Sequence, residues 1–228
     1  MSLDALISEA QGAIALALEG AKNPCVTSSF QHDCVALLHL VTAASPGIPV
    51  LFLETGYHFP ETIEYRDRMT REWNLNLRNL EAKQSVAEQE SQFGILNQTA
   101  PDRCCALRKV DPLFKAVANY NIWLTGLRRD QAKTRSALQE SALFTLPGGK
   151  QVIKLAPLLS WTTRDVWYAC EQLSIPLLPL YEQGYSSIGC EPCTSLPLDP
   201  GDPRSGRWGG RKVECGIHIE PASIRAAS

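Results

Sequence analysis

The chain alternates two kinds of apolar segment, and this alternation is typical of α/β proteins. Residues 3–18 carry apolar side chains at helical spacing from Leu6 to Ile14, which predicts an amphipathic helix that ends at Gly20. Short apolar runs predict buried strands at residues 25–28, 50–53, 75–80, 121–125 and 152–155. Helical spacing and capping residues predict further helices at residues 34–41, 60–73, 85–93, from 101 onward and at 162–173.

This order of elements predicts the fold class. Strands that alternate with helices imply a mainly parallel, twisted sheet with helices on both faces, and such sheets bind ligands at the C-terminal ends of their strands. From about Pro176 onward the periodicity is lost, while prolines and glycines become frequent. We therefore predict an α/β domain over residues 1–200 and an irregular, mobile tail over residues 201–228. With 228 residues, 44% of them hydrophobic, the chain is long enough for one sizeable core.

Charge and hydropathy narrow the class of partner. The formal net charge is −2, so the chain lacks the basic field that duplex DNA binding usually needs, and we expect no nucleic-acid partner. The acidic N-terminal segment is a poor signal peptide, and no apolar run approaches membrane-spanning length. We therefore expect a cytoplasmic protein with no membrane partner, and the sequence leaves a homo-oligomer open. In that reducing compartment, the 8 cysteines are metal ligands, catalytic thiols or buried fillers rather than disulfides.

Two cysteine pairs are the most informative chemical feature. Cys104 and Cys105 are adjacent in the first turn of a predicted helix, and Cys190 and Cys193 enclose a Glu-Pro dipeptide. Four converging thiolates can ligate an iron-sulfur cluster or a structural zinc ion. Adjacent cysteines suit a common zinc site poorly, because its ligands are usually separated by about two to four residues. The pattern favours a [4Fe-4S] cluster and leaves zinc open.

The remaining cysteines divide into buried fillers and one exposed thiol. Three of them lie inside predicted apolar elements, where cysteine behaves as a small hydrophobic residue: Cys25, Cys34 and Cys170. Cys215 stands alone in the tail among cationic side chains, which can favour its thiolate form and gather an anionic substrate. These cations are Arg204, Arg207, Arg211, Lys212 and His218 in its protonated form. Glu214 has the opposite effect, because its negative charge disfavours both the thiolate and an anionic substrate. The pattern predicts a sulfur nucleophile, with an incidental exposed thiol as the alternative.

Two further segments are candidate anion sites. Ser28 and Ser29 lie in the turn between a predicted strand and helix, where hydroxyl and backbone N–H groups can bind an oxyanion. An ordinary βα turn with a serine N-cap is the alternative. Residues 124–135 follow another strand and include Arg128, Arg129, Lys133 and Arg135. Arginine forks suit phosphate and sulfate, and the position after a strand favours a ligand site over a solvated charged face.

Together these motifs resemble the assimilatory sulfonucleotide reductases, specifically the iron-sulfur branch known as adenylylsulfate (APS) reductases. The matching segments are residues 27–30, 54–62, 104–113, 126–131, 185–194, 204–208 and 214–218. The resemblance implies an adenine-nucleotide α-hydrolase-like fold. It also implies reduction of adenosine 5′-phosphosulfate to sulfite and AMP in sulfate assimilation, through an enzyme S-sulfocysteine intermediate.

The resemblance also implies a role for each site residue. Cys215 would be the catalytic nucleophile, and Lys109 would face the substrate beside a [4Fe-4S] cluster. The cluster ligands would be Cys104, Cys105, Cys190 and Cys193. The phosphosulfate would be bound by Ser28 and Ser29, with Arg128, Arg204, Arg207 and His218 as further anion contacts. Thioredoxin or a similar dithiol would supply the electrons in trans.

Two alternatives differ in substrate or in class. The nearest is reduction of the 3′-phosphorylated substrate, PAPS; family members that use it typically lack both cysteine pairs, so the sequence favours APS. The other is a protein of a different class, for which two forms are considered. A non-redox nucleotide-binding module with a structural four-cysteine zinc site would leave Cys215 without a role, and an ATP-pyrophosphatase-type ligase would need a Ser-Gly-Gly loop, which residues 27–30 do not supply.

Overall fold

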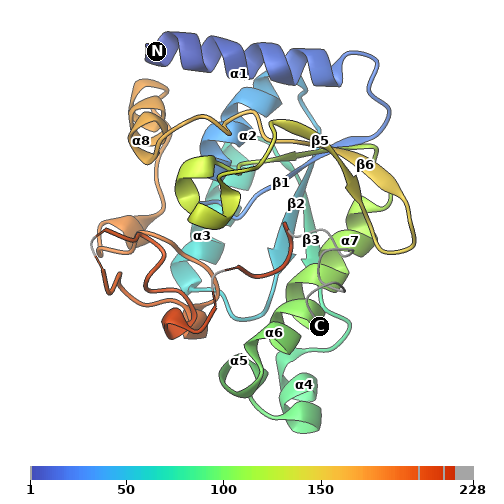
Figure 1. Ribbon diagram of the computed structural model, residues 1–228, viewed down its shortest axis with the longest axis vertical. Helices are drawn as coiled ribbons and strands as arrows, with labels where there is room; N and C mark the ends of the chain where they lie inside the picture. The colour runs from blue at the N-terminus through green and yellow to red at the C-terminus, as the bar shows by residue number, and fades with distance from the viewer. Residues whose placement is uncertain (1, 200, 213, 219–228) are drawn as a thin grey trace.

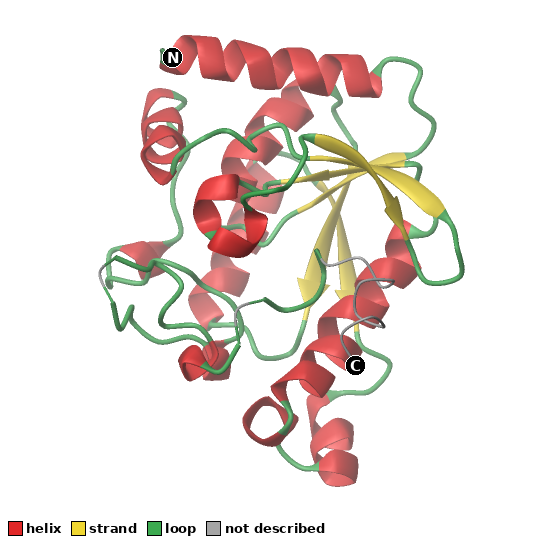
Figure 2. Ribbon diagram, viewed as in Figure 1, coloured by secondary structure: helices red, strands yellow, loops and turns green. Residues whose placement is uncertain are grey.

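The computed structural model describes residues 2–199, 201–212 and 214–218 and is built on one six-stranded sheet. The strand order is β3-β2-β1-β4-β6-β5. The strands are β1 (Pro24–Thr27), β2 (Pro49–Glu54), β3 (Asn76–Glu81), β4 (Ile122–Thr125), β5 (Ser141–Thr145) and β6 (Gln151–Leu155). All neighbouring strands are parallel except β5 and β6, which are antiparallel. The predicted mainly parallel sheet is therefore confirmed (Figure 2).

Helices cover both faces of the sheet because strand side chains alternate between two cores. Val50 and Phe52 of β2 belong to a core shared with α1, α2, α3 and α8, while Leu51 points to a second core with α7. The larger helices are α1 (Leu3–Leu18), α2 (His32–Ala44), α3 (Pro60–Glu72), α4 (Val86–Phe93), α7 (Asp111–Val117) and α8 (Thr163–Gln172). Figure 1 shows α4 at the end of an arm that extends below the sheet.

A continuous helical segment brings the first cysteine pair and Lys109 toward the sheet. It consists of α6 (Pro101–Cys105), a π-helical turn η1 (Ala106–Val110) and α7, and the short α5 (Leu96–Thr99) precedes it. Pro112 explains the wide turn, because its ring has no N–H to donate to the Arg108 carbonyl and crowds it. Such π turns are common at functional sites.

Most predicted elements are present, and one strand was missed. The predicted helix over residues 3–18 has the bounds of α1, and the predicted cap at Thr162 is a capping box that begins α8. The structure adds β5, an edge strand with one buried side chain, Phe144. After α8 the described residues form isolated β-bridges, such as Thr194 with Arg207, and short 3₁₀ turns: η4 (Pro179–Tyr181), η5 (Glu191–Cys193) and η6 (Trp208–Gly210). Two earlier 3₁₀ turns are η2 (Arg129–Gln131) and η3 (Lys133–Arg135).

The sheet order defines where a ligand can bind. The chain passes from β1 outward to β2 and β3 and then returns to the other side of β1 as β4. Crossover connections that leave in opposite directions open a crevice beyond the carboxyl ends of the strands. Among the described residues, no helix is long and apolar enough to cross a membrane.

Candidate active site

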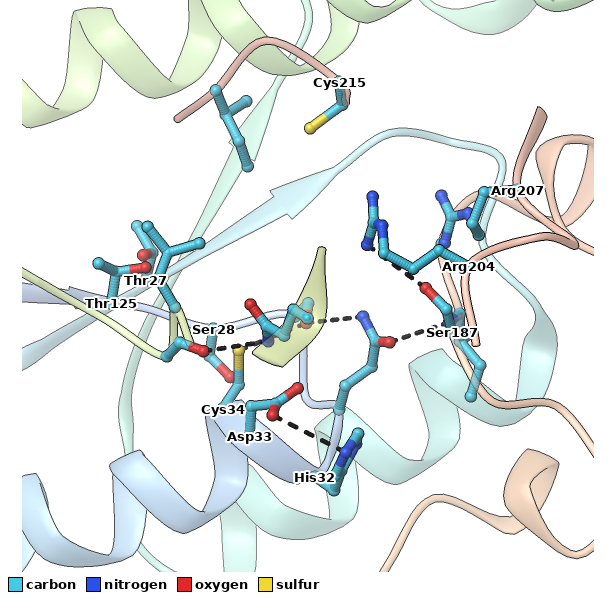
Figure 3. A pocket seen from close by; sticks show the side chains of 18 of the residues that line it. Thr27, Ser28, His32, Asp33, Cys34, Thr125, Ser187, Arg204, Arg207 and Cys215 are labelled. Atoms are coloured by element: carbon cyan, nitrogen blue, oxygen red, sulfur yellow. Dashed lines mark hydrogen bonds and ion pairs between the residues drawn. The ribbon is translucent and has the colours of Figure 1, made fainter. Parts of the chain in front are cut away.

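A cavity of about 380 Å³ lies at the carboxyl ends of β1, β2 and β4, where Thr27, Leu53 and Thr125 line it (Figure 3). All of the residues expected to bind substrate, and Cys215, line this one cavity: Ser28, Ser29, Lys109, Arg128, Arg204, Arg207 and His218. Figure 3 shows Cys215 across the pocket from Ser28 and Cys34. The structure therefore brings together segments that are far apart in the sequence.

The turn after β1 presents two serines in different ways. The backbone N–H of Ser28 donates to the Leu51 carbonyl at 3.0 Å, and its hydroxyl accepts the Phe30 N–H at 3.0 Å. Ser29 is exposed, and its hydroxyl accepts from the side-chain amide of Gln31 at 3.0 Å. The N-cap of α2 is Gln31, which makes no side-chain cap bond. Neither serine is the N-cap, so the alternative of a serine-capped βα turn is wrong.

Arg128 is buried and already engaged by protein groups. The guanidinium is 2% exposed and forms an ion pair with the buried Asp33. It also donates to the Trp161 carbonyl at 3.1 Å, to Asp130 at 3.3 Å and to the Thr163 hydroxyl at 3.2 Å. Burial alone would raise the pKa of Asp33, but the neighbouring His32 and Arg128 hold that pKa below its ordinary value. Arg128 therefore organises the loop after β4.

The tail returns to the pocket through two arginines on a tightly packed loop. Arg204 and Arg207 line the cavity, and Arg207 is only 5% exposed. Burial lowers the pKa of both groups below the ordinary arginine value. A Cβ at Gly206 would lie 2.3 Å from the Ser195 carbonyl oxygen, and one at Gly189 would lie 2.0 Å from Nη2 of Arg207. Glycine is thus required at residue 206, where the clash is with the backbone, while a Cβ at residue 189 would force the buried Arg207 guanidinium to move.

The four cysteines predicted as metal ligands line a second, small cavity beside the pocket: Cys104, Cys105, Cys190 and Cys193. The first three are buried and the fourth is half-buried. The Thr55 hydroxyl lies 3.3 Å from the Cys190 sulfur. Trp208 also lines this cavity, and its indole N–H is buried with no partner among the described residues. Four thiols and an indole N–H without a partner suit a metal centre that is ligated by cysteine sulfur and accepts a hydrogen bond.

The four thiols line the same cavity but do not surround the position of a single metal ion. Within the described ranges, no group of three or more His, Cys, Asp or Glu side chains could hold one metal ion as placed. Four thiolates around one zinc ion must lie about 4 Å apart, since each Zn–S bond is about 2.3 Å. A four-iron cluster offers a separate metal atom to each thiolate and so accepts ligands that are farther apart.

Lys109 borders both cavities. Burial alone would lower its pKa, but the negative charges of Cys190, Cys215 and Cys105 in their thiolate forms raise that pKa well above its ordinary value. Burial likewise opposes ionisation of Cys190, yet Lys109 lowers the pKa of that thiol. A cation that stays charged thus lies between the four-cysteine cavity and the tail thiol.

Cys215 is half-buried, and its neighbours in the tail are anchored on both sides. Glu214 pairs with Arg135, and the His218 ring stacks on Trp123 with centroids 6.0 Å apart and an interplanar angle of 22°. Burial, followed by the nearby Lys154, lowers the pKa of His218 well below its ordinary value. The sequence allowed a protonated His218 as a further cation; the lowered pKa instead favours the neutral imidazole.

Some pocket residues were missed, and one cysteine was misread. Cys25 and Cys170 are core residues as predicted, but the half-buried Cys34 lines the pocket, with its sulfur 3.4 Å from the Ser29 hydroxyl. His58 lines the pocket and was not selected, and Arg135, named only as one of the cations in residues 124–135, lines it as well. The position of His58 just after β2 was a usable signal, because polar residues at strand ends face the ligand crevice.

Comparisons with known proteins agree with the sequence resemblance. The phosphoadenosine phosphosulfate reductase domain family matches residues 23–196. A Rhodococcus opacus protein named adenosine 5′-phosphosulfate reductase is 44% identical over 201 residues, covering 87% of this chain and 80% of that protein. A Streptomyces coelicolor protein of the same name is 43% identical over 196 residues, covering 85% and 81%.

Solved structures show the same fold at lower identity. The phosphoadenylyl-sulfate (PAPS) reductase of Candida auris in its phosphate complex superposes with a TM-score of 0.68 at 23% identity, covering 83% of this chain and 94% of that one. The FMN adenylyltransferase of Candida glabrata, with FAD and pyrophosphate, gives a TM-score of 0.63 at 14% identity, covering 86% and 67%. At these identities, the two structures show the fold alone.

Proposed function

Because the chain belongs to the phosphoadenosine phosphosulfate reductase domain family, we propose that it reduces adenosine 5′-phosphosulfate to sulfite and AMP in cytoplasmic sulfate assimilation. The electrons come from thioredoxin or a similar dithiol. The observation that carries this proposal is one pocket that unites a free thiol, Cys215, with cations and with a neighbouring cavity lined by four cysteines. The named relatives support APS as the substrate.

The first half-reaction transfers a sulfonate to the protein. The Cys215 thiolate attacks the sulfur atom of APS, and a new S–S bond forms. The bond between that sulfur and the phosphate oxygen breaks, and AMP leaves with its electron pair. Cys215 then carries an S-sulfonate.

The second half-reaction releases sulfite and regenerates the thiol. A thioredoxin thiolate attacks the Cys215 sulfur, and sulfite leaves with the electron pair of the S–S bond. The second thioredoxin thiol resolves the mixed disulfide. Thioredoxin is thereby oxidised by two electrons. A tail that moves, as predicted for residues 201–228, would give thioredoxin access to Cys215.

The pocket residues divide the work of binding and charge compensation. The substrate and the thiolate are both anionic, so cations must offset their repulsion before they meet. Lys109 provides this charge beside Cys215, and Arg204 and Arg207 bind the phosphosulfate together with Ser28 and Ser29. His218, being neutral, orients the tail and contributes no charge. The donors of Arg128 are engaged by protein groups, so it supports the site by fixing its loop.

The second cavity is proposed to hold a [4Fe-4S] cluster, with Cys104, Cys105, Cys190 and Cys193 as ligands. When bound, the cluster would supply fixed negative charge and link the helical segment after residue 101 to the segment that carries Cys190 and Cys193. The buried N–H of Trp208 and the Thr55 hydroxyl are available as hydrogen-bond donors to sulfur at this cavity.

The test is sulfonation of Cys215 without a reductant. The anaerobically purified protein is incubated with APS or with PAPS in the absence of thioredoxin, and the denatured intact mass is read beside a Cys215→Ser control. A gain of one SO₃ from APS, absent in the control, is expected. Gain from PAPS alone would identify the sister specificity, and no adduct from either would refute the proposal. Iron, sulfide and zinc analysis of the same sample distinguishes a cluster from a zinc site.

A further inference from the structure

The residue before Cys215 is held by a fork of hydrogen bonds. Glu214 forms a bidentate pair with Arg135, with Nε to Oε1 at 2.8 Å and Nη2 to Oε2 at 2.9 Å. The Thr134 hydroxyl donates to Oε1 at 3.2 Å. The two side chains are only 10% and 11% exposed, so solvent screens the pair weakly. Such a planar fork fixes orientation as well as distance.

Arg135 is itself fixed to the sheet. It is 8% exposed and donates through Nη1 to the Gln131 amide oxygen. That oxygen also accepts the Arg128 backbone N–H at 3.0 Å, and the Gln131 amide nitrogen donates to the Gly126 carbonyl at 3.3 Å. The fork is therefore anchored in the loop that directly follows β4. Its position is set by the same buried loop that shapes the pocket.

We propose that the Arg135–Glu214 pair is a latch that positions Cys215 over the pocket, which makes Arg135 and Glu214 positioning residues for the attack on sulfur. This inference rests on the proposed function, because it takes Cys215 as the nucleophile. Glu214 would otherwise repel an anionic substrate next to the reacting thiol. Paired with Arg135, its charge is neutralised and serves as an anchor.

The protonation state of Glu214 agrees with this role. Burial alone would raise its pKa, but the hydrogen bonds and charge of Arg135 lower it below the ordinary glutamate value. The carboxylate is therefore ionised at neutral pH. Arg204 approaches the same carboxylate at 3.7 Å, so the latch adjoins a residue proposed to bind the phosphosulfate.

The latch predicts different effects on the rates of the two half-reactions. Closing it favours sulfonation, because the thiol must be aligned with the substrate sulfur, and a misplacement of about 1 Å can cost about a hundredfold in rate. Release of sulfite needs the sulfonated thiol to reach thioredoxin, so an intact latch gives no advantage there. Loss of the latch should slow the first step and leave the second unchanged or faster.

The experiment measures both steps in the whole protein. Single-turnover sulfonation by excess APS is followed by quenching and intact mass for wild type, Glu214→Gln and Arg135→Gln. Both variants should form the adduct about 10- to 100-fold more slowly. Preformed adducts are then mixed with thioredoxin, and sulfite release should be at least as fast as in wild type. Glu140→Gln, which makes the same carboxylate-to-amide change at an exposed residue outside the pocket, should match wild type in both steps.

Controls separate positioning from damage to the fold. AMP affinity and iron content should match wild type in both variants, and exchanging the pair in Glu214→Arg/Arg135→Glu should recover part of the sulfonation rate. Adduct formation at the wild-type rate in both single variants would overturn the latch alone. Weakened AMP binding or slowed sulfite release in these variants would also overturn the latch, since either result indicates general disruption of the fold. A wild-type protein that forms no adduct would overturn the proposed function as well.

Discussion

We expect Asp33→Asn to destabilise the protein far more than the same change does at an ordinary surface aspartate. Asp33 is 6% exposed and is the buried counter-charge of Arg128, which is 2% exposed. The substitution keeps the size of the side chain but removes its charge. Among the residues that the structure describes, Asp130, at 3.3 Å, is then the one remaining ion-pair partner of the buried arginine.

The magnitude follows from these contacts. Breaking a buried ion pair by neutralising one partner costs about 3–5 kcal/mol. Because Asp130 remains near Arg128, we take the lower value, about 3 kcal/mol in the free energy of unfolding. For a chain of this size each kcal/mol lowers the melting temperature by about 2–4 °C, so the expected decrease is about 6–12 °C.

The assay is thermal unfolding under anaerobic conditions at a fixed scan rate, followed by calorimetry and by tryptophan fluorescence. Asp67→Asn is the matched control, because Asp67 pairs with Arg66 at 2.8 Å but its side chain is 45% exposed. Such a pair contributes at most about 1 kcal/mol, which corresponds to less than about 4 °C. A decrease for Asp33→Asn no larger than that of Asp67→Asn would refute the assignment of Asp33 as a required counter-charge.

Three further changes test other parts of the site. Lys109→Ala removes the cation beside Cys215 and should slow single-turnover sulfonation by more than about tenfold, a barrier increase of about 1.4 kcal/mol, with iron content unchanged; wild-type kinetics would contradict this role. Gly206→Ala places a Cβ 2.3 Å from the Ser195 carbonyl oxygen, so APS affinity, measured by calorimetry in a Cys215→Ser background that cannot be sulfonated, should fall; an unchanged affinity would contradict the requirement for glycine at this position. The rate of sulfonation should fall as the pH drops below about 6.5. The buried His218 ring resists protonation, whereas an exposed ring takes up a proton in this range, so low pH favours release of the tail from the pocket. His218→Phe keeps a ring against Trp123 and should lose that part of the pH profile; an unaltered profile would exclude His218 as its source.

Local pattern was sufficient for most of the fold and for the kinds of chemistry present. Helix α1 and the capping box at Thr162 were read from spacing and residue type, since helical periodicity and caps depend on neighbours within one turn. The apolar runs located five of the strands to within a residue or two. The cysteine pairs and the tail cysteine stood out by chemistry alone. Strand β5 was not predicted, because only its Phe144 side chain is buried and the segment therefore lacks a clear alternation of polar and apolar residues.

The sequence by itself determined the elements, the fold class and the residue types from which the site is made. Only the tertiary structure decided which of them act together. Arg128 and Arg129 are neighbours in the chain, yet the first is buried against Asp33 and the second is exposed. Arg135 meets Glu214 across 79 residues, a separation that carries no periodic signal. The physical reason is that spacing encodes contacts within a helix or strand, whereas the burial and pairing of a charge depend on which distant segments the sheet brings to the same edge.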